Sequence, residues 1–227
     1  MYLNEQDISG AQFVLERADT IVITTHSSPD GDAIGSATGL YHVLKNLGKQ
    51  VSVIIPDAMP DFLAWMDEGQ ILVGEDHPEK VEKLIHEADV LFCLDYNDPS
   101  RVGKQLAPVV SHAEGTTIMI DHHRDPSDIA DILFSEITAS STAELVWCFI
   151  QDLGWNDRMD QWTAEALYCG MVTDTGSFRF PATSSRVHRI AADLIDRGAR
   201  NAWVHQQVYD GNTESRIRLH GYALSEK

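Results

Sequence analysis

Positive charge and cysteine are both scarce in this sequence of 227 residues. Lys and Arg number 17 against 35 Asp and Glu, which gives a formal net charge of −18. Because non-specific binding to polyanions is mostly electrostatic, this balance excludes a broad groove for long duplex nucleic acid. The three cysteines, Cys93, Cys148 and Cys169, have no CxxC spacing. We expect them to be small core residues of a protein in a reducing compartment.

Long apolar runs are missing as well. No run approaches the roughly 18 residues that a membrane-spanning helix needs, and the N-terminal MYLNEQDISG is polar and acidic, unlike a secretory or transit signal. The sequence also has no internal repeat and no low-complexity tract. We therefore expect a cytoplasmic protein without a membrane partner. Hydrophobic residues make up 43% of the chain, which is enough for the packed core of one sizeable domain.

Short β-branched and apolar runs alternate along the chain with helical patterns. The strands predicted are 21–25, 51–55, 90–94 and 116–120, and the helices are 5–18, 33–47, 76–87, one opened by residues 140–142 and one from about 160. Glu144 stands three residues after Ser141, the spacing of a capping box. A strand, a helix and a second strand imply a right-handed parallel crossover. The predicted fold class is therefore α/β, a doubly wound, mostly parallel sheet flanked by helices.

Aspartate and histidine follow three of the predicted strands and end one of the helices. They are His26, Asp30 and Asp32 after the first strand, Asp95 after the third, Asp121, His122 and His123 after the fourth, and Asp174 at the helix end. In an open α/β sheet, ligands bind in the crevice beyond the carboxyl ends of the strands. We therefore expect these side chains to gather at one edge of the sheet.

Carboxylate oxygens and neutral imidazoles suit Mn²⁺ or Mg²⁺, whereas a structural zinc site would favour thiolates. So many ligands fit two ions roughly 3.5–4 Å apart, which can activate a water molecule and clamp a phosphoryl group. A structural interpretation is also open: Pro29-Asp30-Gly31-Asp32 as a turn and helix N-cap, and Asp174-Thr175-Gly176 as a helix end. Each structural interpretation is credible alone. Together they would require these carboxylates to meet at one edge by accident.

The same segments resemble, in order, the four motifs of the DHH phosphoesterase superfamily. The motifs are His26-x-x-x-Asp30-x-Asp32, the single Asp95, Asp121-His122-His123 and Asp174-Thr175-Gly176-x-Phe178. The resemblance covers about residues 10–222. The fuller wording of residues 26–36, 140–144 and 168–178 is most similar to the bacterial oligoribonuclease and 3′-phosphoadenosine-5′-phosphate phosphatase branch.

The resemblance implies two divalent metal ions, with Mn²⁺ preferred and Mg²⁺ accepted. One ion would be held by His26, Asp30 and Asp95, and the second by Asp32, Asp95, His122 and Asp174, so that Asp95 bridges them. Asp121 would orient the histidine ligands, and His123 would contact the scissile phosphate. Three arginines near the motifs in the sequence are further candidates for phosphate contacts: Arg101, Arg124 and Arg179.

The activity that the resemblance implies is hydrolysis of short oligoribonucleotides, or of the 3′-phosphate of 3′-phosphoadenosine-5′-phosphate, through a metal-bridging hydroxide. The partners expected are therefore short RNA or a nucleoside bisphosphate, and a homodimer is compatible with the sequence. Two alternatives stay open. One is an inorganic pyrophosphatase or polyphosphatase of the same superfamily, and the other is a non-catalytic, metal-dependent nucleotide-binding module.

Members of the superfamily carry a second, substrate-binding domain after a helical linker. We expect residues 1–185 to form the catalytic, metal-binding DHH domain. Residues 186–227 would form a helical connector towards a C-terminal domain that is absent from this chain. Because the strand-end loops offer few aromatic residues on which a base could stack, residues 1–227 are expected to hold the metals but to process nucleotides poorly.

Overall fold

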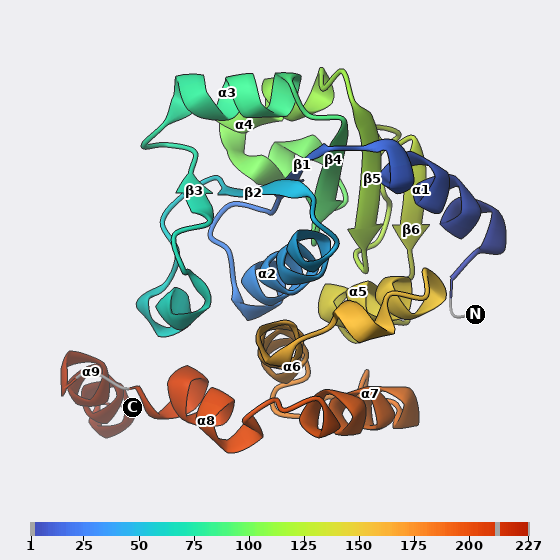
Figure 1. The fold of residues 1–227 in the computed structure, drawn as a ribbon. Helices are drawn as coiled ribbons and strands as arrows, with labels where there is room; N and C mark the ends of the chain where they lie inside the picture. The colour runs from blue at the N-terminus through green and yellow to red at the C-terminus, as the bar shows by residue number, and fades with distance from the viewer. Residues whose placement is uncertain (1–2, 212–213, 227) are drawn as a thin grey trace.

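A single parallel sheet is the centre of the computed structural model, which describes residues 3–211 and 214–226 (Figure 1). The strand order is β3-β2-β1-β4-β5-β6, and every neighbouring pair is parallel. The strands are β1 (Thr20–Thr24), β2 (Gln50–Ile55), β3 (Ile71–Val73), β4 (Val90–Leu94), β5 (Thr116–Asp121) and β6 (Ile132–Ser135). This order reverses between β1 and β4, so the sheet is doubly wound, and the predicted fold class is confirmed.

The helices connect these strands and cover both faces of the sheet. They are α1 (Glu5–Arg17), α2 (Gly31–Asn46), α3 (Pro78–His86), α4 (Gly103–Ser111), α5 (Thr142–Asp152), α6 (Gln161–Asp174), α7 (Ser185–Asp196), α8 (Asn201–His205) and α9 (Glu214–Ser225). The 3₁₀ helices are η1 (Asp61–Met66), η2 (Pro99–Val102) and η3 (Asn156–Arg158), and η4 (Gln206–Asp210) is a π-helical turn. The predicted strands and the first three predicted helices agree with these bounds to within two residues. The edge strands β3 and β6 and the helix α4 are additions to the predicted pattern.

Figure 1 shows three layers, with α3 and α4 above the sheet and α2 and α5 below it. The larger apolar core lies below the sheet and includes Phe92, Ile120 and Phe149, whereas a smaller core under α3 and α4 includes Leu91 and Met119. All three cysteines are buried, as expected. Alternate residues of the central strands therefore face two different cores, which explains why these strands are continuously apolar.

Helices α2 and α6 approach closely at a pair of glycines. A Cβ atom on Gly35 would lie 2.4 Å from the carbonyl oxygen of Ala166 and 2.9 Å from the backbone nitrogen of Gly170. A Cβ atom on Gly170 would lie 2.9 Å from Oδ1 of Asp32. Only glycine allows this distance between the two helix backbones. The contact brings the first turn of α2 close to α6, whose last residue is Asp174.

The segment after α6 packs on the same domain before it reaches α9. Val187, Ile190 and Leu194 of α7 belong to the larger core. In α9, by contrast, Leu219 and Leu224 are exposed. The proposed division into a domain of residues 1–185 and a connector of residues 186–227 stays a prediction, and residues 212–213 and 227 of that connector lie outside the described residues. Within the described residues, no helix has both the length and the apolar character needed to cross a membrane.

Candidate metal centre

The predicted site residues meet at the point where the strand order reverses. His26 follows β1 after one intervening residue, Asp95 comes directly after β4, and Asp121 is the last residue of β5. Asp32 lies in the first turn of α2, and Asp174 is the last residue of α6. The carboxyl ends of adjacent parallel strands form the crevice in which such sheets bind ligands, and the reversal point leaves that crevice open.

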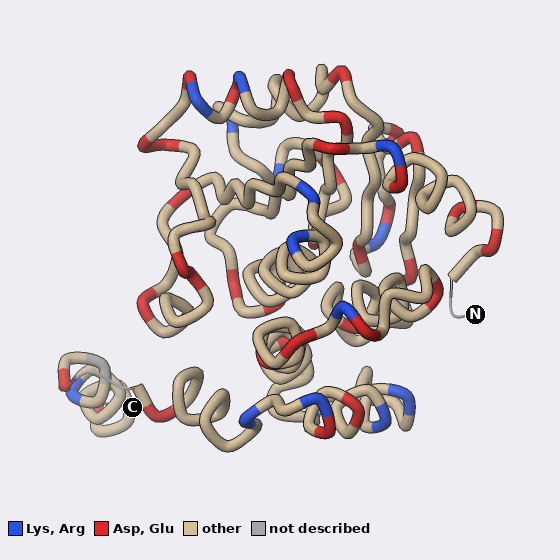
Figure 2. Tube along the Cα trace, in the orientation of Figure 1, with Lys and Arg blue, Asp and Glu red and all other residues tan. Residues whose placement is uncertain are grey.

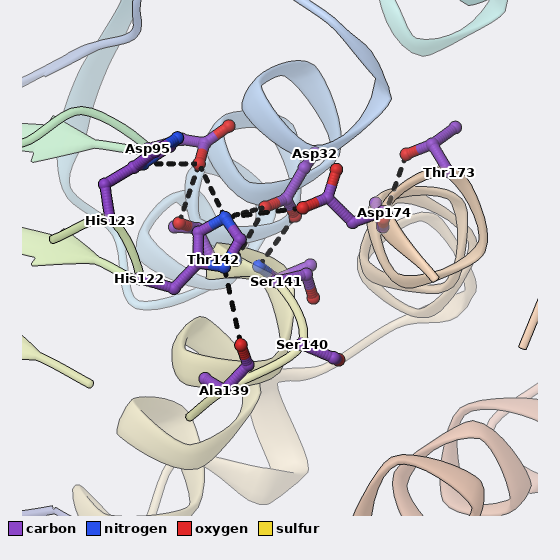
Figure 3. A network of polar contacts seen from close by, with 12 residues as sticks. Asp32, Asp95, His122, His123, Ala139, Ser140, Ser141, Thr142, Thr173 and Asp174 are labelled. Carbon is purple, nitrogen blue, oxygen red and sulfur yellow. Dashed lines mark hydrogen bonds and ion pairs between the residues drawn. The ribbon is translucent and has the colours of Figure 1, made fainter. Parts of the chain in front are cut away.

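Three sets of residues each have ligand atoms that all lie within 4.8 Å of one another. The sets are His26, Asp30 and Asp95; Asp32, His122 and Asp174; and Asp95, His122 and His123. Asp95 belongs to two of these sets, and its two oxygens face different histidines. Oδ2 lies 3.4 Å from Nε2 of His26, and Oδ1 lies 3.6 Å from Nε2 of His122. In Figure 3, the carboxylates of Asp32, Asp95 and Asp174 and the ring of His122 converge on one space.

His26 and His122 both direct Nε2 towards the carboxylates. Nδ1 of His26 lies 2.8 Å from the carbonyl oxygen of Ser27, and Nδ1 of His122 lies 3.4 Å from that of Ala139. A carbonyl oxygen can only accept, so Nδ1 carries the proton and Nε2 keeps a lone pair for a metal. Burial, aided by the nearby His123, also lowers the pKa of His122 and favours the neutral, ligating form of its ring.

His123 is held in a different way. Its Nδ1 lies 2.7 Å from Oδ1 of Asp121, and its backbone N–H donates to Oδ2 of the same carboxylate over 3.0 Å. Asp121 is fully buried. The histidine that Asp121 orients is therefore His123, whereas backbone carbonyls orient the rings of His26 and His122.

The carboxylates of the centre are close together and poorly solvated. Burial raises the pKa of Asp32 and Asp95 well above the usual range, and negative neighbours, foremost Asp95 for Asp32 and Asp30 for Asp95, raise it further. Burial and the charge of Asp30 also raise the pKa of Asp174 to about 7. Among the described residues, the ion pairs of these carboxylates involve only histidines. Oxygen ligands that repel one another and lack a Lys or Arg partner fit hard divalent cations.

The N-terminus of α5 holds two of these carboxylates in place. The backbone N–H groups of Thr142 and Ala143 donate to the two oxygens of Asp32 over 2.6 and 2.9 Å. The hydroxyl of Thr142 donates to Oδ1 of Asp95 over 2.9 Å. Asp32 thus accepts from the free N–H groups that begin a helix, where a negative charge is favourable (Figure 3).

A buried glutamate fixes the segment that leads into α5. Glu144 is 1% exposed and accepts from the backbone N–H and the hydroxyl of Ser140 over 2.7 and 2.8 Å. Its other oxygen accepts from Nε of Arg186 on α7 over 2.5 Å. The predicted capping box is confirmed only in part: Ser141 does cap α5, but the Glu144 carboxylate accepts from the backbone N–H of Ser140 and not from that of Ser141.

Asp30 fits both interpretations of its motif, and Asp95 has an unusual backbone conformation. Asp30 is the N-cap of α2 and accepts from the backbone N–H groups of Asp32 and Ala33. Asp95 has a φ of +63°, which is uncommon and costly for a residue other than glycine. Its backbone N–H donates to the carbonyl oxygen of Ile120 over 3.1 Å, which keeps this conformation in place. Strained residues of this kind concentrate at functional sites.

The three candidate arginines lie at the margin of the centre. The carbonyl oxygen of Arg101 accepts from the backbone N–H of Ser27, and that of Arg124 accepts from the side chain of Asn97. Nε of Arg179 donates to the carbonyl oxygen of Gly176 over 2.6 Å. Among the described contacts, none joins one of these guanidinium groups to the acidic residues, so their phosphate contacts stay a prediction.

Fold and site together define a doubly wound α/β protein with an acidic and histidine-rich crevice at the reversal of its strand order. Residues 20–171 match the family described as "DHH family, N-terminal domain", and the chain belongs to this family. The bifunctional oligoribonuclease and PAP phosphatase NrnA of Thermus thermophilus is 36% identical over 208 residues, which cover 90% of this chain. The protein of the same name from Bacillus subtilis is 27% identical, again over 90% of this chain.

One solved structure has a higher sequence identity to this chain than the two NrnA proteins have. The crystal structure of an exopolyphosphatase-related protein from Bacteroides fragilis has 42% sequence identity and a TM-score of 0.96 over 99% of this chain. The chain spans 58% and 61% of the length of the two NrnA proteins and 66% of the length of the Bacteroides protein. The likeness therefore extends through α7 and α8, beyond the segment that matches the family.

Proposed function

We propose that the chain holds two divalent metal ions and hydrolyses phosphoester bonds of short oligoribonucleotides and of 3′-phosphoadenosine-5′-phosphate. The observation that carries this proposal is the position of Asp95, whose two oxygens face Nε2 of His26 and Nε2 of His122. One ion would be held by His26, Asp30 and Asp95. The second would be held by Asp32, Asp95, His122 and Asp174. The oxygen and imidazole donors favour Mn²⁺, with Mg²⁺ as the alternative.

The residues of the chain divide the remaining tasks. When bound, a pair of divalent ions supplies a water of lowered pKa and offsets the charge of a phosphoryl group. His123 is turned by Asp121 so that Nε2 is left for the substrate, where a proton on that atom can pass to the leaving oxygen. Thr142 and the N-terminus of α5 keep Asp32 and Asp95 in position, which is the orienting role that partners of metal ligands commonly have.

The substrate class is supported by the two NrnA proteins, whose names state oligoribonuclease and PAP phosphatase activity. The net charge of −18 supports short substrates, because little electrostatic attraction is available for a long polyanion. A second candidate, polyphosphate or pyrophosphate hydrolysis, is favoured by the name of the Bacteroides protein. Phosphate release from pyrophosphate, from 3′-phosphoadenosine-5′-phosphate and from a dinucleotide, measured side by side with Mn²⁺, separates these two activities.

The proposal is tested on Asp95. Calorimetric titration should find two Mn²⁺ ions per chain in the wild type, and Asp95→Ala should weaken both and remove turnover. Asp128→Ala, which changes an exposed aspartate outside the three sets, is the matched control and should behave as the wild type. Two tightly bound ions in Asp95→Ala would contradict the bridging role. Tight binding of Mn²⁺ and nucleotide by the wild type without any turnover would instead favour a non-catalytic binding module.

A further inference from the structure

Two neighbouring cavities lie between η1 and η4, and one of them reaches the acidic crevice. The inner cavity, of about 290 Å³, joins Asp30 and Asp174 to Phe62, Val208 and Tyr209 in one lining. The outer cavity, of about 310 Å³, shares Phe62 with it. Asp30 and Asp174 come from different ligand sets. A molecule in the inner cavity would therefore lie directly beside the metal centre.

The aromatic side chains that line the inner cavity are fixed by contacts with other residues of the domain. The hydroxyl of Tyr209 donates to the carbonyl oxygen of Val172 over 3.3 Å, and its ring stacks on His205 with centroids 5.9 Å apart at 28°. His205 in turn lies 3.4 Å from the hydroxyl of Tyr168. Phe62 packs against the larger core. Tyr209 nevertheless keeps 39% of its surface exposed, so a ring of fixed orientation remains available to a ligand.

The charges of the residues that line the two cavities determine which ligands can bind there. Asp61 and Asp210 line the outer cavity together with the amides of Gln206 and Gln207. No lysine or arginine is among the described residues that line either cavity. A phosphate would be repelled here, whereas an uncharged heteroaromatic ring can stack on the aromatic residues and exchange hydrogen bonds with the amides. In Figure 2, the turn of residues 61–66, at the left of the view below β3, carries an acidic segment and no basic one.

We propose that the inner cavity is a nucleobase subsite of the metal centre. The base of the nucleotide whose phosphate lies at the acidic crevice stacks against Tyr209 and Phe62, and Gln206 and Gln207 face the next base or ribose outward. Stacking on aromatic rings accepts any base, so the subsite selects nucleotides over inorganic phosphates without selecting a sequence. This inference rests on the proposed function. The expectation that residues 1–227 process nucleotides poorly stays a prediction, and in this proposal Phe62 of η1 and Tyr209 of η4 supply the aromatic rings for a base.

The test compares substrates with and without a base. Tyr209→Ala and Phe62→Leu should each raise KM for a dinucleotide roughly tenfold. The same variants should leave KM unchanged for a dinucleotide in which both nucleosides are abasic riboses, and Tyr209→Phe should retain most of the affinity. Phe62→Leu keeps an apolar side chain against the core, so it preserves the fold if alanine does not. Phe13→Leu, which changes an exposed ring on α1, is the control.

A second measurement separates the subsite from the proposed function. Calorimetry with Mn²⁺-loaded protein and AMP reports base binding without turnover. If the wild type binds AMP through Phe62 and Tyr209 but hydrolyses only pyrophosphate, the proposed function is wrong and the subsite stands. If Tyr209→Ala and Phe62→Leu, with unchanged Mn²⁺ stoichiometry, match the wild type on the dinucleotide and on AMP, the subsite is wrong.

Discussion

The hydroxyl of Thr142 donates to Oδ1 of Asp95, the oxygen that also lies 3.6 Å from Nε2 of His122. The backbone N–H of Thr142 donates at the same time to Asp32. The first residue of α5 therefore contacts two carboxylates, one on α2 and one directly after β4. Because a hydrogen bond to a metal ligand fixes its orientation, losing such a partner typically costs 10–100-fold in metal affinity.

Thr142→Val should weaken Mn²⁺ binding roughly tenfold, because valine has the shape of threonine without the donor to Asp95. The backbone N–H that holds Asp32 is kept in this variant. Thr142→Ser restores the donor and should bind Mn²⁺ nearly as the wild type does. Titration calorimetry at fixed pH measures both, and equal affinities for valine and serine at position 142 would show that the hydroxyl does not orient Asp95.

Glu144→Gln should lower the free energy of unfolding by about 1–3 kcal/mol, because it removes the buried partner of a partly exposed charge, Arg186. Urea titration at neutral pH measures the change. The control is Glu214→Gln on α9, where Glu214 and Arg218 form a pair with both side chains more than 70% exposed. That variant should change stability by about 0.5 kcal/mol or less. Similar losses in the two variants would show that Glu144 does not anchor the segment before α5.

The sequence predicts the centre of this fold better than its edges. Strands β1, β2, β4 and β5 have five or six residues that are mostly apolar or β-branched, and such runs are a clear strand signal in the sequence. Strand β3 has three residues, all half-buried, and β6 has four residues with a single buried one. Such short edge strands form because a neighbouring strand offers backbone partners, so their own sequences contain little evidence of them.

Some residues of the site could also be predicted from the sequence, and others could not. Asp95, His122 and the other ligand candidates could be placed together from the order of the motifs and the rule that parallel strands end at one edge. The link from Glu144 to Arg186 could not be foreseen, since it joins residues 42 positions apart on two helices. Phe62 and Tyr209 are further apart still in the sequence, and they line one cavity only because the fold brings η1 and η4 together.

Gly35→Ala should destabilise the protein by about 1–3 kcal/mol, because the new Cβ would lie 2.4 Å from the backbone oxygen of Ala166 and would force α2 and α6 apart. Metal affinity should fall as well, since Asp32 and Asp174 lie on the two separated helices. Gly10→Ala on α1 is the control, because the nearest atom to its Cβ would be Cδ1 of Ile132 at 3.6 Å. That variant should gain about 0.5–1 kcal/mol. Thermal melts measure both variants. A similar loss of stability in Gly35→Ala and Gly10→Ala would contradict the close contact.

The raised pKa values of the centre predict how its stability depends on pH. An aspartate in an unfolded chain has a pKa near 3.9, whereas burial and the charge of Asp30 raise the pKa of Asp174 to about 7 in the fold. Between these values the native state binds more protons than the unfolded state, so the free energy of unfolding falls as pH rises through this window. Asp32 and Asp95 act in the same direction. The pKa of His122, and that of His42 outside the centre, are lowered by burial and act in the opposite direction below about 6.5, two groups against three.

Without metal, Tm should therefore decrease from pH 5 to pH 8. Divalent ions bind the deprotonated carboxylates, so the rise in Tm on adding Mn²⁺ should be small at pH 5 and large at pH 8. Asp174→Asn removes one of the raised groups and should flatten the pH dependence of the metal-free protein, whereas Asp128→Asn, an exposed control, should leave it unchanged. Differential scanning fluorimetry with EDTA or Mn²⁺ across this pH range measures all three proteins. A metal-free Tm that climbs steadily from pH 5 to pH 8 would mean that these carboxylates are not held together against their own charge, and the electrostatic argument for a cation site would be lost.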